Sequence, residues 1–252
     1  LKRKPGSINT NDPRRDELWG LHNSGQTIGF KQGIEDVDID APEAWEIAEG
    51  KPETVVAVID TGVAYNHPDL VDAMWNGANC KDENGNSLGG CKHGYDFSQN
   101  DKDPFPSFGE FGFDASHGTH IAGTIAATKN NGKGIVGVAP GVKVMALKVN
   151  FSLDSLVRAT DFARTNGAKV INASYHSFGY SQAERESIER FIGAGGLFIT
   201  SAGNSYSDND TEYDQYPAKY PLDGIVSVAA TDNSDKKASF SNWGAKTVDI
   251  GA

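Results

Sequence analysis

The amino-acid sequence predicts an α/β fold with a doubly wound, mostly parallel sheet that carries helices on both faces. Two observations predict it: apolar runs of strand length recur along the chain, and amphipathic helical patterns lie between them. Near-continuous apolar strands are typical of parallel sheets that are buried on both faces. In such a sheet the functional residues gather at the edge where the strands end.

The order of elements follows from these patterns. Helical patterns cover residues 154–166 and 181–193, and the second opens with Ser181 and Glu184 in capping-box spacing. These helices are expected to form right-handed crossovers between parallel strands. The predicted strands are residues 55–59, 142–149, 168–174, 196–202 and 224–230.

Two long polar segments interrupt this alternation. Residues 1–40 form a predicted amino-terminal arm, and residues 70–116 form a long polar segment that is predicted to be a surface loop. Loops of this length in a compact domain are usually functional or are held by a disulfide or a metal ion. We expect one domain over residues 1–252, with the arm as part of it.

Composition and charge exclude two classes of protein. The formal net charge of -11 argues against nucleic acid as a partner, because binding to phosphates depends on Lys and Arg. No apolar run approaches the length needed to cross a bilayer, so we expect no membrane span.

The chain contains two cysteines, Cys80 and Cys91, at the two ends of a polar, glycine-rich stretch. We expect a disulfide that closes this loop, and a disulfide favours a secreted, extracellular protein. The alternative is a pair of free thiols in a cytosolic enzyme, where thiols on an exposed loop would be reactive.

Two side chains that can exchange a proton follow predicted elements. Asp60 directly follows the strand at residues 55–59, and His117 opens the run HGTHIAGTIAA, which favours a packed helix. A buried carboxylate on one ring nitrogen fixes the tautomer of a histidine and stabilises the imidazolium. We expect Asp60 to orient His117 in this way, while an Asp before Thr and Gly is also typical of a turn.

The same histidine allows a second hypothesis. His117 and His120 lie on one predicted helix and could be ligands of a zinc hydrolase. No glutamate of the zinc-protease type lies between them, so this pattern is weak.

A third candidate is Asn204, which follows the predicted strand at residues 196–202 in the run SAGN. Acyl transfer places negative charge on a carbonyl oxygen, and a fixed amide donor stabilises that charge in the transition state. Asn204 could be such a donor, or simply an asparagine in a turn.

The runs VAVIDTGVAYNHPDL, HGTHIAGTIAA, GVAPGVKVMALKV, AKVINAS and SAGN occur in this order. Together they resemble the subtilisin-like serine proteases, and within them the thermitase-like branch, over nearly the whole chain. The resemblance implies a three-layer fold and a secreted endopeptidase that cleaves peptide bonds through an acyl-enzyme. It implies Asp60 as the orienting acid, His117 as general base and acid, and Asn204 as the oxyanion donor. The implied partners are peptide or protein substrates and the protein's own prosegment or a protein inhibitor.

In this family the nucleophilic serine lies in a GTS-type motif at a helix start, beyond the position that matches Ala252. We therefore expect a further carboxyl-terminal fragment to complete the triad, and we assign the role to no serine of this chain. Without the nucleophile, turnover should fall by about a millionfold. The rival hypothesis is a catalytically inactive, calcium-binding fragment or pseudoprotease that acts as a binding or regulatory module.

The resemblance also implies structural calcium ions. The first implied site uses Asp12, Asp69 and Asn131, whose oxygen ligands suit Ca²⁺ and would tie the arm to the core. The second implied site lies in the run GYDFSQNDKDP and uses Asp96 and Asp101 with Asp103 nearby. The alternative is a solvated acidic loop at each place.

Substrate contacts are expected along the cleft. Tyr175, His176 and Ser177 stand where the family has a small, glycine-containing run, so we expect them to crowd the first specificity pocket. The residues predicted to contact substrate are Ser174, Tyr175, His176, Gly195, Gly196, Ser201, Ala202 and Gly203.

Overall fold

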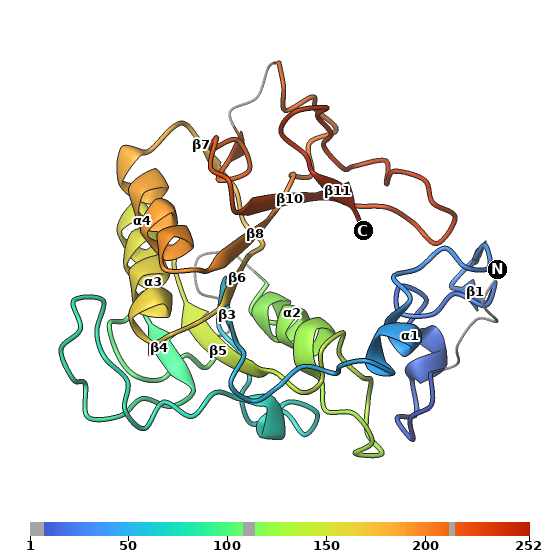
Figure 1. The fold of residues 1–252 in the computed structure, drawn as a ribbon, viewed down its shortest axis with the longest axis horizontal. Coiled ribbons are helices and arrows are strands. Elements are labelled where there is room, and N and C mark those ends of the chain that lie inside the picture. Colours follow the sequence, from blue (N-terminus) through green and yellow to red (C-terminus); the bar gives the residue numbers. More distant parts are fainter. Residues whose placement is uncertain (1–7, 108–113, 212–214) are drawn as a thin grey trace.

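The computed structural model describes residues 8–107, 114–211 and 215–252. Within these residues, the largest sheet has seven strands in the order β11-β10-β8-β6-β3-β5-β4 (Figure 1). Every neighbouring pair in it is parallel. In chain order its strands are β3 Val55–Asp60, β4 Gly94–Asp96, β5 Lys143–Lys148, β6 Val170–Ala173, β8 Leu197–Ser201, β10 Ile225–Ala229 and β11 Ile250–Gly251.

Helices and short strand pairs complete the architecture. The α-helices are α1 Ala41–Trp45, α2 His117–Ala126, α3 Leu153–Thr165 and α4 Gln182–Gly193, and short 3₁₀ helices cover Arg15–Glu17 and Val71–Ala73. Two antiparallel pairs lie outside the large sheet: β1 Thr27–Ile28 with β2 Lys31–Gln32, and β7 Ser177–Phe178 with β9 Gln215–Tyr216. None of the helices in the described ranges is long and apolar enough to span a bilayer.

The central strand β3 has all six residues buried. Val55, Ala57 and Ile59 belong to the core cluster that includes residues of α3 and α4, such as Phe162 and Phe191. Val56 and Val58 belong to a second cluster with Ala122 and Ala126 of α2. Because successive side chains of a strand point to opposite faces, the sheet is covered by α3 and α4 on one face and by α2 on the other (Figure 1). The predicted three-layer α/β fold is confirmed.

The predicted crossover helices occur within one residue of their expected bounds, as α3 and α4. At the start of α4 the Ser181 hydroxyl accepts a hydrogen bond from the Glu184 amide at 3.3 Å, as capping-box spacing predicts. The Glu184 carboxylate does not return to the Ser181 amide, which instead donates to the Tyr220 hydroxyl. The carboxylate is buried and accepts from Tyr220 at 2.7 Å, and burial raises the pKa of Glu184.

The amino-terminal arm is fastened at positions far away in the sequence. The Asn23 side-chain amide is fully buried and donates to the Asn233 carbonyl oxygen at 3.1 Å. The backbone amide of Ile34 donates to the same oxygen at 2.9 Å. The Asp12 carboxylate accepts from the backbone amides of Asn130 and Asn131. The arm is therefore bonded both to the loop after β10 and to the loop after α2.

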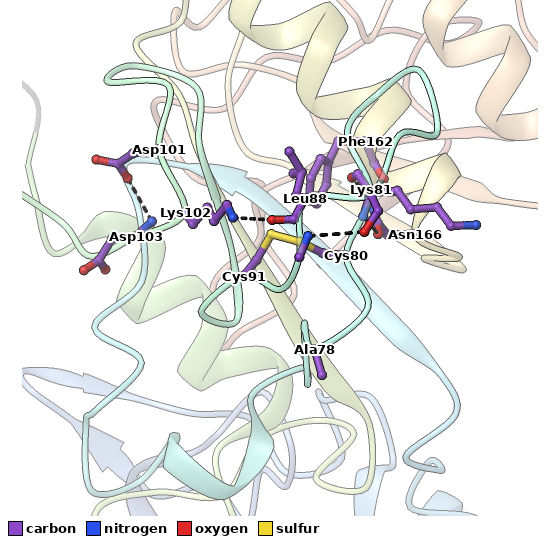
Figure 2. The surroundings of a disulfide bond; sticks show 12 residues. Ala78, Cys80, Lys81, Leu88, Cys91, Asp101, Lys102, Asp103, Phe162 and Asn166 are labelled. Atoms are coloured by element: carbon purple, nitrogen blue, oxygen red, sulfur yellow. Dashed lines mark hydrogen bonds between the residues drawn. A yellow bond between two sulfur atoms is a disulfide. The ribbon is translucent and has the colours of Figure 1, made fainter.

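The predicted disulfide between Cys80 and Cys91 is present, and it closes a polar loop over α3 (Figure 2). Cys80 is fully buried in the core cluster that contains Phe162. The backbone of Lys81 exchanges two hydrogen bonds with the side chain of Asn166, which caps the end of α3. The loop is thus pinned both by the covalent bond and by the helix end.

Replacing both cysteines by alanine is expected to lower the free energy of unfolding by about 2–4 kcal/mol, because the unfolded chain regains the freedom of the closed loop. Urea unfolding with and without a reductant measures it: the reductant should destabilise the unaltered protein and leave the double variant unchanged. Equal stability of the two proteins under oxidising conditions would contradict a stabilising role for the bond.

Candidate active site

Asp60 and His117 meet at the carboxyl end of β3. The Nδ1 atom of His117 lies 2.8 Å from Oδ1 and 2.9 Å from Oδ2 of Asp60. The Asp60 side chain is 1% exposed and the His117 side chain is 47% exposed. The carboxylate is therefore buried behind an imidazole whose other nitrogen, Nε2, is left for a reacting group.

Local sequence explains this approach of helix to strand. The Thr61 amide donates to Asp60 Oδ1 at 2.7 Å, and the Thr61 hydroxyl accepts from the Gly118 amide at 3.2 Å. A Cβ at Gly118 would lie 2.3 Å from the Gly62 carbonyl oxygen and 3.0 Å from Asp60 Cβ. Only glycine allows the first turn of α2 to lie this close to the strand end.

The carboxylate also changes the acidity of the histidine. The hydrogen bond with Asp60 raises the pKa of His117 above its ordinary value of 6.5, against the opposing effect of burial. The nearby Asp114 carboxylate contributes a smaller rise. The protonated ring of His117 is thus stabilised, as is required of a general base that accepts a proton during the reaction.

Asn204 follows the parallel strand β8, and its side chain is exposed. Since β8, β6 and β3 are neighbours in one parallel sheet, Asn204 and Asp60 follow strands that end at the same edge. The structure therefore brings Asp60 and His117 into contact and places Asn204 at their edge of the sheet.

The residues predicted to contact substrate divide into three groups. Ser174 and His176 follow β6, and residues 201–203 end β8, so these lie at the edge that carries Asp60. Tyr175 instead points into the core, where it is 6% exposed and contacts the ring of Phe151. The expectation that Tyr175 crowds the specificity pocket is wrong, because its ring fills the core under α4.

Gly195 and Gly196 also differ from the expectation. They end α4 and precede β8, so they lie at the amino end of the strand. In a parallel sheet this edge is opposite to the one that carries Asp60. We therefore do not retain them as substrate contacts.

The first predicted ion site is assembled from three distant segments. Asp12 and Asp69 are buried, and the Asn131 side-chain amide donates to Asp69 Oδ1 at 2.7 Å. The backbone of Asn131 donates to Asp12 Oδ1 at 3.2 Å. Among the described residues, neither carboxylate forms an ion pair with a basic side chain. Two buried carboxylates are hard oxygen donors that suit Ca²⁺, whereas the Asn131 amide directs its Nδ2 atom to Asp69 and its Oδ1 atom accepts from the Lys133 amide.

The carboxylates of the second predicted ion site have other partners. Asp96 is buried and pairs with Lys148 Nζ at 2.9 Å. Asp103 pairs with Lys92 Nζ at 3.2 Å, and Asp101 accepts from the Asp103 amide at 2.8 Å. Lysines already neutralise two of the three charges, so we do not carry this ligand set further.

The zinc hypothesis finds no support in the described ranges. They contain no group of three or more His, Cys, Asp or Glu side chains that could hold a metal ion. His117 Nδ1 is occupied by Asp60, which leaves His120 without an evident set of co-ligands.

Comparison with known proteins agrees with this geometry. The subtilase family, Peptidase_S8, matches residues 51–252. The chain belongs to the subtilase family. The matched segment of this subtilase includes Asp60, His117 and Asn204.

Individual relatives are similar over most of this subtilase chain. Fervidolysin of Fervidobacterium pennivorans is 36% identical over 246 residues, which are 91% of the chain and 29% of fervidolysin. Thermitase of Thermoactinomyces vulgaris is 33% identical over 219 residues, which are 85% of the chain and 67% of thermitase. The crystal structure of fervidolysin, described as a keratinolytic enzyme related to subtilisin, superposes with a TM-score of 0.68 at 32% identity, over 100% of this chain and 34% of that one.

Sequence reasoning missed several polar residues that hold the site of this subtilase. Thr61 links Asp60 to the start of α2, and Asn209 and Asn242 are buried beside the turn that carries Asn204. Each stands in a polar run typical of a surface turn. No local pattern separates a buried asparagine from an exposed one, because burial depends on partners far along the chain.

Proposed function

We propose that the protein containing this chain is a serine endopeptidase that cleaves peptide bonds through an acyl-enzyme. The observation that carries the proposal is the approach of both Asp60 carboxylate oxygens to within 2.9 Å of His117 Nδ1. A buried carboxylate with this contact is the orienting half of a Ser-His-Asp triad. The relatives described as proteases support the same activity.

The proposed residues have separate roles. His117 Nε2 takes the proton of the attacking hydroxyl and later gives it to the leaving amine. Asp60 keeps the proton on Nδ1 and stabilises the imidazolium. The Asn204 amide donates to the carbonyl oxygen as it becomes an oxyanion. No serine hydroxyl among the described residues forms a hydrogen bond with the His117 ring, and we assign the nucleophile to none of them.

A fluorophosphonate probe with a peptide hydrolysis assay tests this proposal on the protein that carries the chain. We expect hydrolysis and covalent labelling of a serine, and we expect His117→Ala to abolish both. His120→Ala is the matched control on the same helix, and it should retain both activities. A folded protein that is neither labelled nor active would instead be a binding or regulatory module.

The pH dependence of kcat/KM should show the titration of His117. The histidine must be neutral to accept a proton, and the hydrogen bond that its ring donates to Asp60 raises its pKa above 6.5, so activity should fall on the acid side at a midpoint above 6.5. Initial rates with a neutral peptide substrate between pH 5 and about 9 measure the midpoint. A midpoint below 6.5 would mean that Asp60 does not raise the affinity of this ring for a proton.

We propose in addition that Asp12, Asp69 and Asn131 hold a structural calcium ion. The support is their common position, the burial of both carboxylates and the hard oxygen ligands that they offer. Bound calcium would supply no chemistry to peptide cleavage. It would neutralise two buried charges and fasten the arm to the loop at residues 130–135.

Removing calcium with a chelator is expected to lower the melting temperature, because an ion that binds only the folded state stabilises it, by about 2.7 kcal/mol at a hundred times its Kd. Asp12→Asn should have a lowered melting temperature that no longer responds to the chelator. Asp103→Asn, which alters the second carboxylate set, should respond like the unaltered protein. A chelator response that survives in Asp12→Asn would place the ion elsewhere.

The cellular context is part of the same proposal. The disulfide and the family membership favour a secreted protein. Peptides or proteins would be its substrates, and its prosegment or a protein inhibitor would be its protein partner in the same cleft.

A further inference from the structure

The turn that carries Asn204 combines a free side chain with a tightly held backbone. The Asn204 side chain is exposed. On its amino side, the Ala202 carbonyl oxygen accepts from the Asn209 side-chain amide at 2.8 Å, and the Gly203 carbonyl oxygen accepts from the Asn242 backbone amide at 2.9 Å. The chain that leads into Asn204 is thus fixed at two successive carbonyls.

The carboxyl side of the turn is fixed by one side chain. The Asn242 Oδ1 atom accepts from the Ser205 amide at 2.8 Å and from the Ser207 amide at 3.1 Å. Its Nδ2 atom donates to Asn209 Oδ1 at 3.0 Å. Asn209 and Asn242 therefore form one hydrogen-bonded pair, and this pair also bonds to the backbone before and after Asn204.

Burial strengthens the hydrogen bonds that this pair makes to the turn. Both asparagines are 0% exposed, so water does not compete for their hydrogen bonds. Gly203 has a positive φ of 106°, and a Cβ there would lie 2.6 Å from Asn242 Nδ2. The pair thus packs directly against the backbone that Asn204 extends from, and a glycine is required at the contact.

We propose that Asn209 and Asn242 are positioning residues that preorganise Asn204 as the oxyanion donor, an inference that rests on the proposed peptidase function. A donor stabilises a developing charge to the extent that it is already in place when the charge appears. The buried pair holds the backbone in place from both sides and leaves only the short Asn204 side chain to reach the oxyanion.

Kinetics of single and double variants test this proposal. Asn242→Ala is expected to lower kcat by about 10–100-fold with little change in KM, because a misplacement of about 1 Å has an effect of this size. Asn204→Ala should lower kcat by about 10²–10³-fold. In the Asn204→Ala background, Asn242→Ala should have almost no further effect on kcat, because the residue that it positions is gone.

A matched control separates positioning from stability. Asn23 is also fully buried, and its side-chain amide donates to the carbonyl oxygens of Val37 in the arm and of Asn233 in the loop after β10. Asn23→Ala should lower the melting temperature and leave kcat unchanged. Where Asn242→Ala does not fold, Asn209→Ala removes the bond to Ala202 and serves in the same cycle.

Two further results decide the outcome. An equal loss of kcat from Asn242→Ala with and without Asn204 would overturn the proposal, because the asparagine would then act independently of the donor. Hydrogen exchange of the Ser205 and Ser207 amides tests their hydrogen bonds to Asn242 without an activity assay. Exchange should become faster in Asn242→Ala and stay unchanged in Asn23→Ala. Unchanged exchange overturns the positioning role, whereas an unaltered protein without hydrolysis overturns the peptidase function.

Discussion

Asp60→Asn is expected to lower kcat for peptide hydrolysis by about 10⁴-fold. An amide in place of the carboxylate can donate to His117 Nδ1, which favours the wrong tautomer and removes the charge that stabilises the imidazolium. Both contacts shorter than 3 Å between the two side chains depend on that carboxylate. Single-turnover and steady-state rates with one peptide substrate measure the loss, and the acid midpoint of any residual activity should move to lower pH.

Asp114→Asn is the matched control for this experiment. Asp114 is exposed and bonds to Ser116, and it acts on the His117 ring only through its charge. We expect a loss of less than about tenfold from this variant, because a solvent-screened charge has a small effect. Similar losses from Asp60→Asn and Asp114→Asn would show that Asp60 contributes charge alone and does not orient the histidine.

Asp96→Asn is expected to lower the free energy of unfolding by about 3–5 kcal/mol, because it removes a buried carboxylate that compensates the charge of the buried Lys148 ammonium. The two side chains lie 2.9 Å apart and are 1% and 4% exposed. Lys148 also donates to the Ser107 hydroxyl, and Asp96 accepts from two backbone amides. Urea unfolding measures the change, provided that the free energy of unfolding depends on urea concentration with the same slope in both proteins.

A second ion pair, which is exposed, provides the comparison. Lys92 and Asp103 are 63% and 44% exposed, so Asp103→Asn should cost about 0–1 kcal/mol. The double variant Asp96→Asn with Lys148→Met should be more stable than the sum of the single variants predicts, since it removes both buried charges. Additive losses would argue that the two groups do not interact.

The elements of the sheet could be predicted because their signal is local. The run Val55 to Ile59 has strand length and is apolar throughout, and the pattern of α3 repeats at helical spacing. The shared edge of the sheet then placed Asp60 and Asn204 together without any coordinates. The strand β4 was missed, because its three residues lie inside a polar segment and are buried by pairing with β5 and by packing of Tyr95 against Phe162 of α3.

The errors in the site have a common physical origin. Asp96 was assigned to a calcium site by resemblance to the family, and its pairing with Lys148 of another strand is not visible in the local sequence. Tyr175 was expected at the specificity pocket because it stands where the family has a small, glycine-containing run, yet its hydroxyl contacts Glu184 in the core. Gly195 and Gly196 were assigned to the cleft in the comparison with the family, without regard to the direction of β8. Side-chain direction and charge pairing depend on tertiary contacts, which no local pattern encodes.

The attachment of the arm has a consequence for the order of assembly. The hydrogen bond from Asn23 to Asn233 joins residues 210 positions apart, and the bonds of Asp12 span more than a hundred. Contacts of such long range form slowly, because closing the long loop between the two residues costs conformational entropy before the contact contributes any stability. We therefore expect the arm, although it is synthesised before the loops that it contacts, to be among the last segments to settle on the finished molecule.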